Sequence, residues 1–406
     1  MLPALLPSYE ELEFEPEPLR LKVSRLRGIE DFDTLAAEWD ALDAEILPRT
    51  PFTSRLWNSL WWQHLRRDNL AVRDQFHSYV IRDQYGHLIA VAPMMLTSRP
   101  AIGPLRAREL HFFGADANLT EIRGLVCRPR HHLAATGALL EAIGNECSDW
   151  SWTYLSGLRA LDSEIVETPA ATAGATPTLT WTRHIPCYFL RMNGDWDEFK
   201  ARLPRNTKEA LRKCYNSLRR DGLRFEFKAI RDPIDCDAAL SCFLRMHRQR
   251  AVCEGVSIRH PDNFRALRSR RFLRAYAREL AQRDQLRIFQ ISIAGRVAAT
   301  RVGFQFGDQV YLYCSGYDPR WRKYSLMTTL IAEAIRWCID QQVTVVNLST
   351  GTDRSKTRWR PECSMHSEAI ARGPGLRARL AFMASKALLP RLRLRAAAIS
   401  PDLGRA

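Results

Sequence analysis

Three basic side chains stand directly before a long apolar helix pattern. Arg320, Arg322 and Lys323 precede Ser325, and residues 326–339 repeat apolar side chains at helical spacing. The free N–H groups at the start of a helix, with the positive end of its dipole, favour a bound anion. Serine both caps helices and donates its hydroxyl to phosphate. The pattern predicts an anion site here. An ordinary basic loop before an amphipathic helix is the open alternative.

A further cation, Lys356, follows an apolar strand pattern and a turn that contains Gly351 and Asp353. Arg358 and Trp359 come directly after it. The lysine is a candidate site residue, and a solvated lysine in a basic loop is the alternative. His247 lies on an apolar helical face, which favours a packed interior histidine over a catalytic base.

Several common sites are missing from the sequence. It has no Gly-rich phosphate loop, Gly-x-Ser-x-Gly elbow, His-Glu-x-x-His pair or dinucleotide fingerprint. The common NTPase, α/β-hydrolase and zinc-protease classes are therefore excluded. The ten cysteines form no Cys-x-x-Cys pair, and Cys363 with His366 supplies too few ligands for zinc. We expect no metal, and reduced thiols in a cytoplasmic protein.

The chain of 406 residues carries 60 Lys and Arg against 45 Asp and Glu, a net charge of +15. This balance favours a polyanionic partner: nucleic acid, anionic lipid or the phosphates of a nucleotide-type cofactor. Generally arginine-rich, solvated surfaces are the alternative. No apolar run approaches the roughly 18 residues of a membrane-spanning helix, and the acidic, proline-rich start predicts no secretory signal.

The elements that must position these residues repeat an order. From residue 19, strand and helix patterns follow one another as strand, helices, three or four strands including residues 119–128, helix and strand. From about residue 185 the order recurs: strand, helices, antiparallel strands, the helix at 326–339 and a final strand. We therefore expect an α/β (α+β) protein of two similar domains.

Composition and pattern give four segments. We expect an acidic, proline-rich flexible tail at 1–18, domains at 19–190 and 191–372, and a basic amphipathic extension at 373–406. The extension could dock on anionic lipid, which adds peripheral contact with the inner membrane face to a cytoplasmic location.

An ordered set of short landmarks marks the second half and, more sparsely, the first. They are Phe243-Leu244 with His247 and Arg250, Arg287-Ile288-Phe289, Tyr311-Leu312-Tyr313, Gly316-Tyr317-Asp318, the run from Asn347 through Lys356 to Trp359, and, earlier, Pro51-Phe52, Trp57, Trp61-Trp62 and Phe113-Gly114. With them the chain resembles the GNAT-fold acyltransferases of the CelD/BcsL group, which are related to the FemAB aminoacyltransferases.

The resemblance implies tandem GNAT-like domains, each a mixed, mainly antiparallel sheet flanked by helices. It implies a GNAT-family N-acyltransferase with acyl-CoA, such as acetyl-CoA, as co-substrate. The acceptor would be an amine or hydroxyl of a sugar or cell-envelope (polysaccharide) precursor. The donor's diphosphate would lie at Arg320, Arg322, Lys323, Tyr324 and Ser325. Lys356 would stabilise the oxyanion or a substrate phosphate. The candidate bases are Asp353, His366 and, through water, Asp318, and Tyr313 or Tyr324 could protonate the leaving thiolate.

Three positions depart from the family pattern: no glycine occurs near Ser325, Asn347 stands where aspartate is usual, and Ser355 replaces a tyrosine. Two other functions therefore stay open. A FemAB-like enzyme would use aminoacyl-tRNA, which suits the basic segment 196–231. A degenerate transferase would act as an adaptor at the membrane surface.

Overall fold

The computed structural model describes residues 19–103, 106–116, 118–146, 150–158, 179–253, 260–373 and 375–384. The predicted tail at 1–18 and most of the predicted extension at 373–406 lie outside the described residues. Within the extension, residues 376–384 are helical, as the amphipathic pattern predicts.

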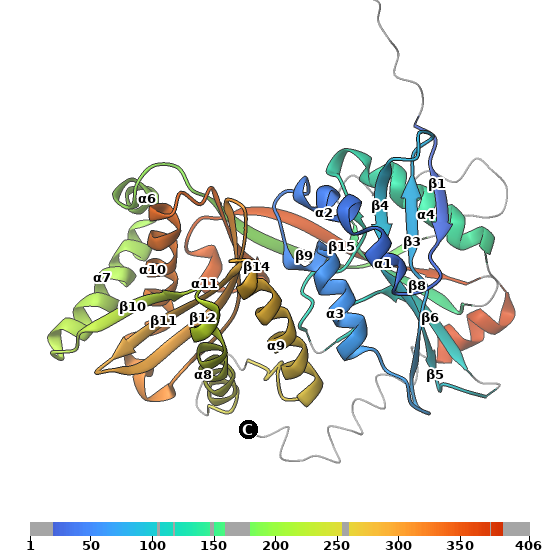
Figure 1. Ribbon diagram of the computed structural model, residues 1–406. Coiled ribbons are helices and arrows are strands. Elements are labelled where there is room, and N and C mark those ends of the chain that lie inside the picture. Colours follow the sequence, from blue (N-terminus) through green and yellow to red (C-terminus); the bar gives the residue numbers. More distant parts are fainter. Residues whose placement is uncertain are drawn as a thin grey trace, which may run out of the picture.

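One sheet of eleven strands runs through both halves of the chain (Figure 1). Its only parallel pairs are β13 with β14 and β6 with β8 among the described strands. In sheet order the strands are β10 (Phe225–Ile230), β11 (Leu286–Ile293), β12 (Arg296–Phe306), β13 (Gln309–Tyr317), β14 (Val345–Thr350), β9 (Leu179–Arg191), β15 (Glu362–Arg372), β8 (Trp152–Leu158), β6 (Ala107–Phe112), β5 (Met94–Arg99) and β2 (Arg73–Phe76).

A second, four-stranded sheet belongs to the first half alone. Its strands, in order, are β1 (Lys22–Arg25), β3 (Tyr79–Arg82), β4 (Leu88–Ala92) and β7 (Val126–Cys127). The helices of this half are α1 (Asp31–Thr34), α2 (Ala36–Ala44), α3 (Arg55–Leu65) and α4 (His132–Glu146), with single turns at Pro51–Thr53 and Pro129–His131.

The second half has helices on both faces of its sheet, with α7 and α10 on one face and α8 and α9 on the other (Figure 1). Ile288 and Phe289, successive residues of β11, accordingly join different cores. The helices are α6 (Trp196–Arg202), α7 (Arg205–Arg220), α8 (Pro233–Ala251), α9 (Leu267–Gln282), α10 (Leu326–Asp340) and α11 (Arg354–Thr357), and the turn η4 (Pro319–Tyr324) precedes α10. The predicted mixed, mainly antiparallel fold is confirmed.

Strands β9 and β15 join the halves. β9 pairs with β14 along residues 187–191 and with β15 along residues 179–189. β15 also pairs with β8. Sequence reasoning did not predict β15, because its segment Glu362–Arg372 mixes polar and charged residues with few apolar ones. The strand is held by ladder hydrogen bonds on both edges, and only the small side chains of Ala369 and Ala371 join a hydrophobic core.

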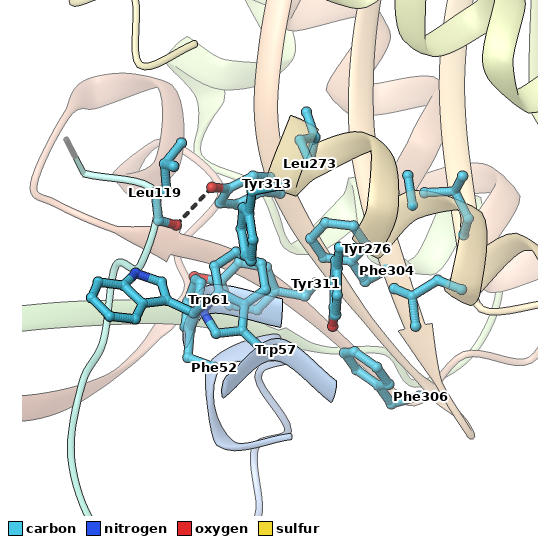
Figure 2. Close-up of a cluster of buried hydrophobic side chains, with 14 of the residues drawn as sticks. Phe52, Trp57, Trp61, Leu119, Leu273, Tyr276, Phe304, Phe306, Tyr311 and Tyr313 are labelled. Atoms are coloured by element: carbon cyan, nitrogen blue, oxygen red, sulfur yellow. Dashed lines mark hydrogen bonds between the residues drawn. The ribbon is translucent and has the colours of Figure 1, made fainter. Parts of the chain in front are cut away.

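The aromatic stripe of α3 is core, as its spacing predicts. Trp57 is 1% exposed, and its ring centroid lies 4.8 Å from that of Phe272 and 4.9 Å from that of Tyr276, both in α9 (Figure 2). Phe52 contacts Tyr311 of β13 in the same cluster. A continuous apolar core thus connects the two halves, which fixes the position of one half relative to the other.

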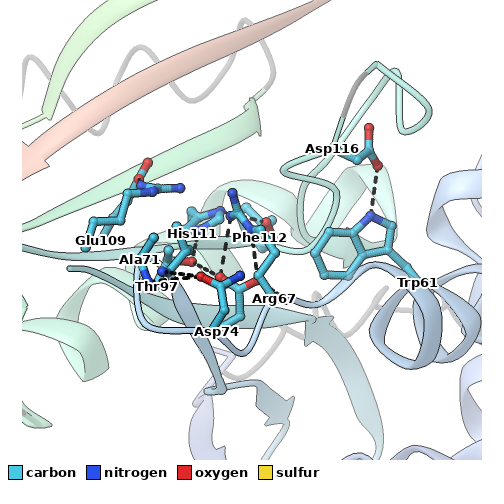
Figure 3. A network of polar contacts seen from close by, with 12 residues as sticks. Trp61, Arg67, Ala71, Asp74, Thr97, Glu109, His111, Phe112 and Asp116 are labelled. Atoms are coloured by element: carbon cyan, nitrogen blue, oxygen red, sulfur yellow. Dashed lines mark hydrogen bonds and ion pairs between the residues drawn. The ribbon is translucent and has the colours of Figure 1, made fainter. Parts of the chain in front are cut away.

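The predicted strand at 119–128 is wrong for most of its length, because only Val126–Cys127 is a strand. Asp116 accounts for the difference. Its Oδ1 accepts the backbone N–H groups of Leu119 (2.7 Å) and Thr120 (3.2 Å), while its Oδ2 accepts the Thr120 hydroxyl (2.7 Å) and Trp61 Nε1–H (2.8 Å; Figure 3). The Asp116 side chain thus accepts backbone N–H groups that a strand would donate to its neighbour in the sheet.

Polar contacts also tie together the strands β2, β5 and β6. The buried carboxylate of Asp74 accepts from the backbone N–H of Arg67 (2.7 Å) and from Thr97 Oγ1 (2.7 Å; Figure 3). Thr97 in turn lies 2.8 Å from His111 Nε2. Because each of these buried groups has a partner, they stabilise this edge of the sheet.

Candidate active site

The central feature of the second half is a divergence of two parallel strands. The β13–β14 ladder contains only three residue pairs, from Gln309–Val345 to Tyr311–Asn347. β13 nevertheless continues to Tyr317. Beyond Tyr311 no described ladder pair joins the two strands, so a gap opens between their backbones. On β13 the carbonyls of Leu312 and Tyr313 accept hydrogen bonds from Arg301 Nη2, both at 3.2 Å.

The end of β13 leads through η4 to the start of α10, where the sequence predicts the anion site. Ser325 adopts a left-handed conformation (φ 52°, ψ 40°) between the two helical elements. It holds the N-cap position of α10, but its side chain makes no capping hydrogen bond there. The backbone at Ser325 therefore adopts a conformation that glycine would adopt without strain.

The neighbouring candidates contact carboxylates. Arg320 forms an ion pair with Asp318 (Nη2 to Oδ2 2.5 Å). Lys323 Nζ lies 3.0 Å from Asp221 Oδ2, which also accepts the hydroxyl of Tyr324 at 2.8 Å. Hydrogen bonds from Lys323, Tyr324 and Arg220 lower the pKa of Asp221 to about 2. Arg322 is exposed. The structure thus groups the predicted residues but uses two of the cations in local ion pairs.

A different arginine reaches the first turn of α10. Arg358 Nη1 donates to Thr328 Oγ1 at 3.1 Å. Arg358 and Arg354 line a cavity of about 260 Å³ beside the start of α7. Both arginines flank Lys356 in the sequence, and this position was the only signal that could have identified them. Sequence reasoning assigned that segment to catalysis instead.

Lys356 and Asp353 lie together after β14, as predicted. Lys356 Nζ donates to the carbonyl of Thr350 and lies 3.2 Å from Asp353 Oδ2. Gly351, with φ +97°, makes the turn over which the lysine folds back. Burial raises the pKa of Asp353, but hydrogen bonds from Ser355 and the charge of Lys356 outweigh burial, so the net pKa is lowered. The carboxylate therefore stays ionised beside the ammonium.

The two other departures from the family pattern have local partners. Asn347 Oδ1 accepts the backbone N–H of Ser349 at 2.8 Å and so holds a residue with φ 74°. Ser355 donates its hydroxyl and its backbone N–H to Asp353. An amide oxygen serves the first purpose as well as a carboxylate would.

Glu121 is a site residue that sequence reasoning missed. It comes from the Asp116 loop of the first half, and its Oε2 accepts from Ser349 Oγ (2.6 Å) and from the hydroxyl of Tyr311. Tyr311 is the last residue of β13 that pairs with β14. The carboxylate therefore lies where the strands diverge, and only tertiary structure could place it there.

Tyr313 holds the loop that carries Glu121. It is 3% exposed, and its hydroxyl donates to the carbonyl of Leu119 at 2.6 Å (Figure 2). Burial raises its pKa well above the ordinary value. No described contact joins Tyr313 to Lys356 or Asp353.

Two further basic groups lie near this site. Arg250, at the end of α8, donates to Ser315 Oγ (2.8 Å) and to His260 Nε2 (2.6 Å). Burial and the charge of Arg250 lower the pKa of His260 to about 4, while Asp353 opposes the shift. His260 is therefore neutral at pH 7. His247 is buried and lies 2.9 Å from the Ser315 carbonyl, as an interior histidine should.

The described residues contain neither a candidate metal cluster nor a candidate membrane span. No group of three or more His, Cys, Asp or Glu side chains in them could hold a metal ion. Among the same residues, no helix has the length and apolar content needed to cross a bilayer.

Residues 205–357 match a family described as "Acetyltransferase (GNAT) domain". Among solved structures, FemX is similar over 85% of this chain and 96% of its own, with a TM-score of 0.50 and 8% identity. A tandem GNAT protein from the clavulanic acid biosynthesis pathway covers 88% of this chain and 100% of its own (TM-score 0.44, 11% identity). L-PGS from Bacillus licheniformis covers 87% and 96% (TM-score 0.43, 11% identity). No curated protein matches the sequence.

The matched segment runs from α7 to α11 and includes the diverging strands and Lys356. Residues 205–357 of the second half therefore match the GNAT domain that the sequence predicts there. The likeness to FemX extends the shared fold over both halves. Membership of the CelD/BcsL group stays a prediction.

Proposed function

We propose that the protein is an acyl-CoA-dependent acyltransferase of the CelD/BcsL type. It transfers an acyl group, such as acetyl, to an amine or hydroxyl of a sugar or other cell-envelope (polysaccharide) precursor. The observation that carries the proposal is the divergence of β13 and β14 between the start of α10 and the Lys356–Asp353 pair. An extended thioester bound in this gap would have its phosphates at one end and its carbonyl at the other.

On the donor side, the diphosphate would accept N–H groups at the start of α10. Arg322 and Arg358 supply positive charge there. Arg320 and Lys323 would have to exchange their carboxylate partners, Asp318 and Asp221, for phosphate. Because Arg358 already contacts Thr328 in the first turn, we expect its contribution to exceed that of Arg320.

In the transfer step, the acceptor nitrogen or oxygen bonds to the thioester carbonyl carbon and loses a proton. The C–S bond breaks, and the CoA thiolate takes up a proton in its place. Lys356 would stabilise the negative charge on the carbonyl oxygen in the transition state. Asp353 would position that ammonium. Tyr313 would act at a distance, as the residue that holds the loop of Glu121.

Calorimetry with CoA and acetyl-CoA tests the donor site. We expect saturable binding that falls about ten-fold in Arg358→Gln, which removes one charged contact to phosphate. Arg205→Gln, an exposed arginine paired with Glu209 on α7, serves as the matched control and should bind normally. Absence of CoA binding by the unaltered protein would overturn the proposal.

A basic surface favours the aminoacyl-tRNA alternative. A cavity of about 510 Å³ beside α7 is lined by Trp196 and by four cations, Lys200, Lys208, Arg212 and Arg336, among others. Aromatic and basic groups together suit nucleic acid. Tight, salt-dependent tRNA binding without CoA binding would support this reading.

The adaptor alternative requires binding of neither CoA nor tRNA. It rests on the basic segment 373–406, and liposome sedimentation of the full chain against a chain ending at Gly373 tests it. If both stay in the supernatant at low salt, this alternative fails. Cytoplasmic location with peripheral membrane contact is part of the same proposal.

A further inference from the structure

A cavity with two lobes lies between the halves of the chain, next to the proposed reaction centre. One lobe, of about 200 Å³, is bordered mainly by apolar side chains, among them Leu47, Phe52, Leu125 and Phe189. The other, of about 60 Å³, is bordered mainly by polar ones. The lobes share Ile122, Arg123, Gly157 and His366, so they are adjacent.

Charges of both signs border the polar lobe. Glu121, Glu368, Arg123 and Arg183 all line it. None of the four forms an ion pair with another charged side chain in the described part of the chain. The acids accept hydrogen bonds from neutral hydroxyls instead, Glu368 from Tyr154 and Glu121 from Tyr311 and Ser349. Glu368 is buried and Glu121 and Arg123 are half-buried, while Arg183 is exposed. Since charges that are partly withdrawn from water need opposite charges, the lobe suits a ligand that carries both signs.

The polar lobe also borders the reaction centre. Thr350 lines it, and the carbonyl of Thr350 accepts Lys356 Nζ. Ser349, the preceding residue, binds Glu121. A group bound by Glu121 is thus separated from the Lys356 turn by about one residue of backbone.

We propose that the acyl acceptor is a zwitterionic amine with an apolar substituent. Its ammonium binds Glu121, its acidic group binds Arg123 and Arg183, and its apolar part fills the larger lobe. This inference rests on the proposed acyl transfer and takes as its acceptor, in place of a sugar, an amine next to an acidic group, as in a free amino acid.

Glu121 then has a chemical task. The bound ammonium transfers a proton to the carboxylate, and the free amine attacks the thioester carbon. The C–N bond forms and the C–S bond breaks. The nitrogen then gives up a second proton, and the leaving CoA thiolate takes up that proton. The carboxylate is suited to this step because the hydroxyls of Tyr311 and Ser349 orient it.

Three size-matched probes test the acceptor class on the full chain in the presence of CoA. L-Leucine carries both charges, L-leucinamide only the positive one and 4-methylpentanoate only the negative one. Saturation-transfer NMR should give L-leucine an affinity about ten-fold higher than that of either analogue, because each analogue leaves one charge unpaired. Equal affinities, or no binding of L-leucine, would overturn the inference.

Variants assign the two charges. Glu121→Gln should weaken L-leucine and L-leucinamide about ten-fold and leave 4-methylpentanoate unchanged. Arg123→Gln should weaken L-leucine and 4-methylpentanoate by a similar factor and leave L-leucinamide unchanged. Glu45→Gln, which removes a surface partner of Arg128, is the control and should alter none of them. The relative affinities of the three probes for the unaltered protein test the inference even if a variant does not fold. If CoA binds and no probe does, this inference fails and the proposed function stands. If CoA does not bind, the proposed function fails.

Discussion

At the scale of single residues, the candidate site is built from side chains with strong local partners. Lys356 is held by a carbonyl and a carboxylate, and Glu121 by two hydroxyls. Such contacts fix the position of each charged group before any ligand arrives, which is the condition for electrostatic stabilisation of a transition state. Two predictions belong to this scale.

Replacing the proposed oxyanion stabiliser should impair chemistry more than binding. For Lys356→Met we expect a loss of about 100-fold or more in kcat with acetyl-CoA affinity retained, because one preorganised donor is removed. Release of the CoA thiol measures the rate. Lys200→Met, which removes an exposed partner of Asp197, is the control. A rate equal to that of the control would remove Lys356 from the site.

His77 should make stability depend on pH. Burial and the charges of Arg25 and Arg108 lower its pKa to about 4 in the folded chain. An unfolded histidine titrates near 6.5, so the unfolded chain binds more protons between these values and stability falls as pH falls through this window. From pH 7.5 to 5 we expect a loss of about 2 kcal/mol from this group.

The urea midpoints at pH 7.5 and 5 measure this loss. His77→Gln should show a smaller difference between the two values, whereas His87→Gln, at an exposed histidine beside Asp83, should behave like the unaltered protein. If His77→Gln shows the full pH dependence, another group causes it.

At the scale of elements, two short backbone segments decide the geometry. The left-handed residue before α10 sets where that helix begins, and the contact between β8 and the loop after Glu121 sets how deeply the loop lies. In both segments the backbone conformation, rather than a side-chain contact, fixes the geometry.

Ser325 holds a conformation that favours glycine. Ser325→Gly should therefore raise the free energy of unfolding by about 1 kcal/mol, since the strain of a left-handed Cβ is removed. Ser325→Ala keeps the Cβ and should give no such gain. Urea unfolding of the two variants measures the difference, and equal midpoints would show that the strain is absent.

Gly157 allows the loop of Glu121 to lie against β8. A Cβ there would stand 2.2 Å from the carbonyl oxygen of Arg123, and the residue has φ +73°. We expect Gly157→Ala to cost about 2–3 kcal/mol in unfolding free energy.

Gly137, in α4, offers the opposite case for the same substitution, because a Cβ there has nothing within 4 Å. Gly137→Ala should stabilise by about 0.5–1 kcal/mol. Thermal unfolding compares the two variants. Similar effects of both would contradict the close packing of the loop.

At the scale of the whole molecule, the halves share one sheet and one core. β15 pairs with strands of both halves, and Trp57 of the first half packs on α9 of the second. The boundary proposed between 190 and 191 falls at the end of β9, a strand whose ladder extends to both sides.

We therefore expect the two halves to unfold together. Urea transitions followed by tryptophan fluorescence and by far-UV circular dichroism should coincide. Phe272→Ala removes an aromatic partner of Trp57 and should lower the free energy of unfolding by about 3–5 kcal/mol. Both urea midpoints should therefore fall by the same amount. Two separate transitions would show that the halves fold as independent domains.

The sequence by itself determined the elements whose signals are local. Helical spacing gave α3 with its buried tryptophans and α10 with the cations before it, and the order of strands and helices gave the mixed fold. The Lys356–Asp353 pair was also within reach, because three residues and one turn separate its members. In each case the interacting groups are neighbours in the chain.

Only the tertiary structure decided the rest, because the partners are far apart in sequence. Glu121 meets Ser349 across 228 residues, in a loop that Asp116 withdraws from the expected strand. Arg320 and Lys323 find carboxylates, while Arg358 reaches the first turn of α10. Strand β15 lacks an apolar pattern and forms because its ladder partners lie on both sides. Periodicity records which face of an element is buried, but not which charged groups the fold brings together.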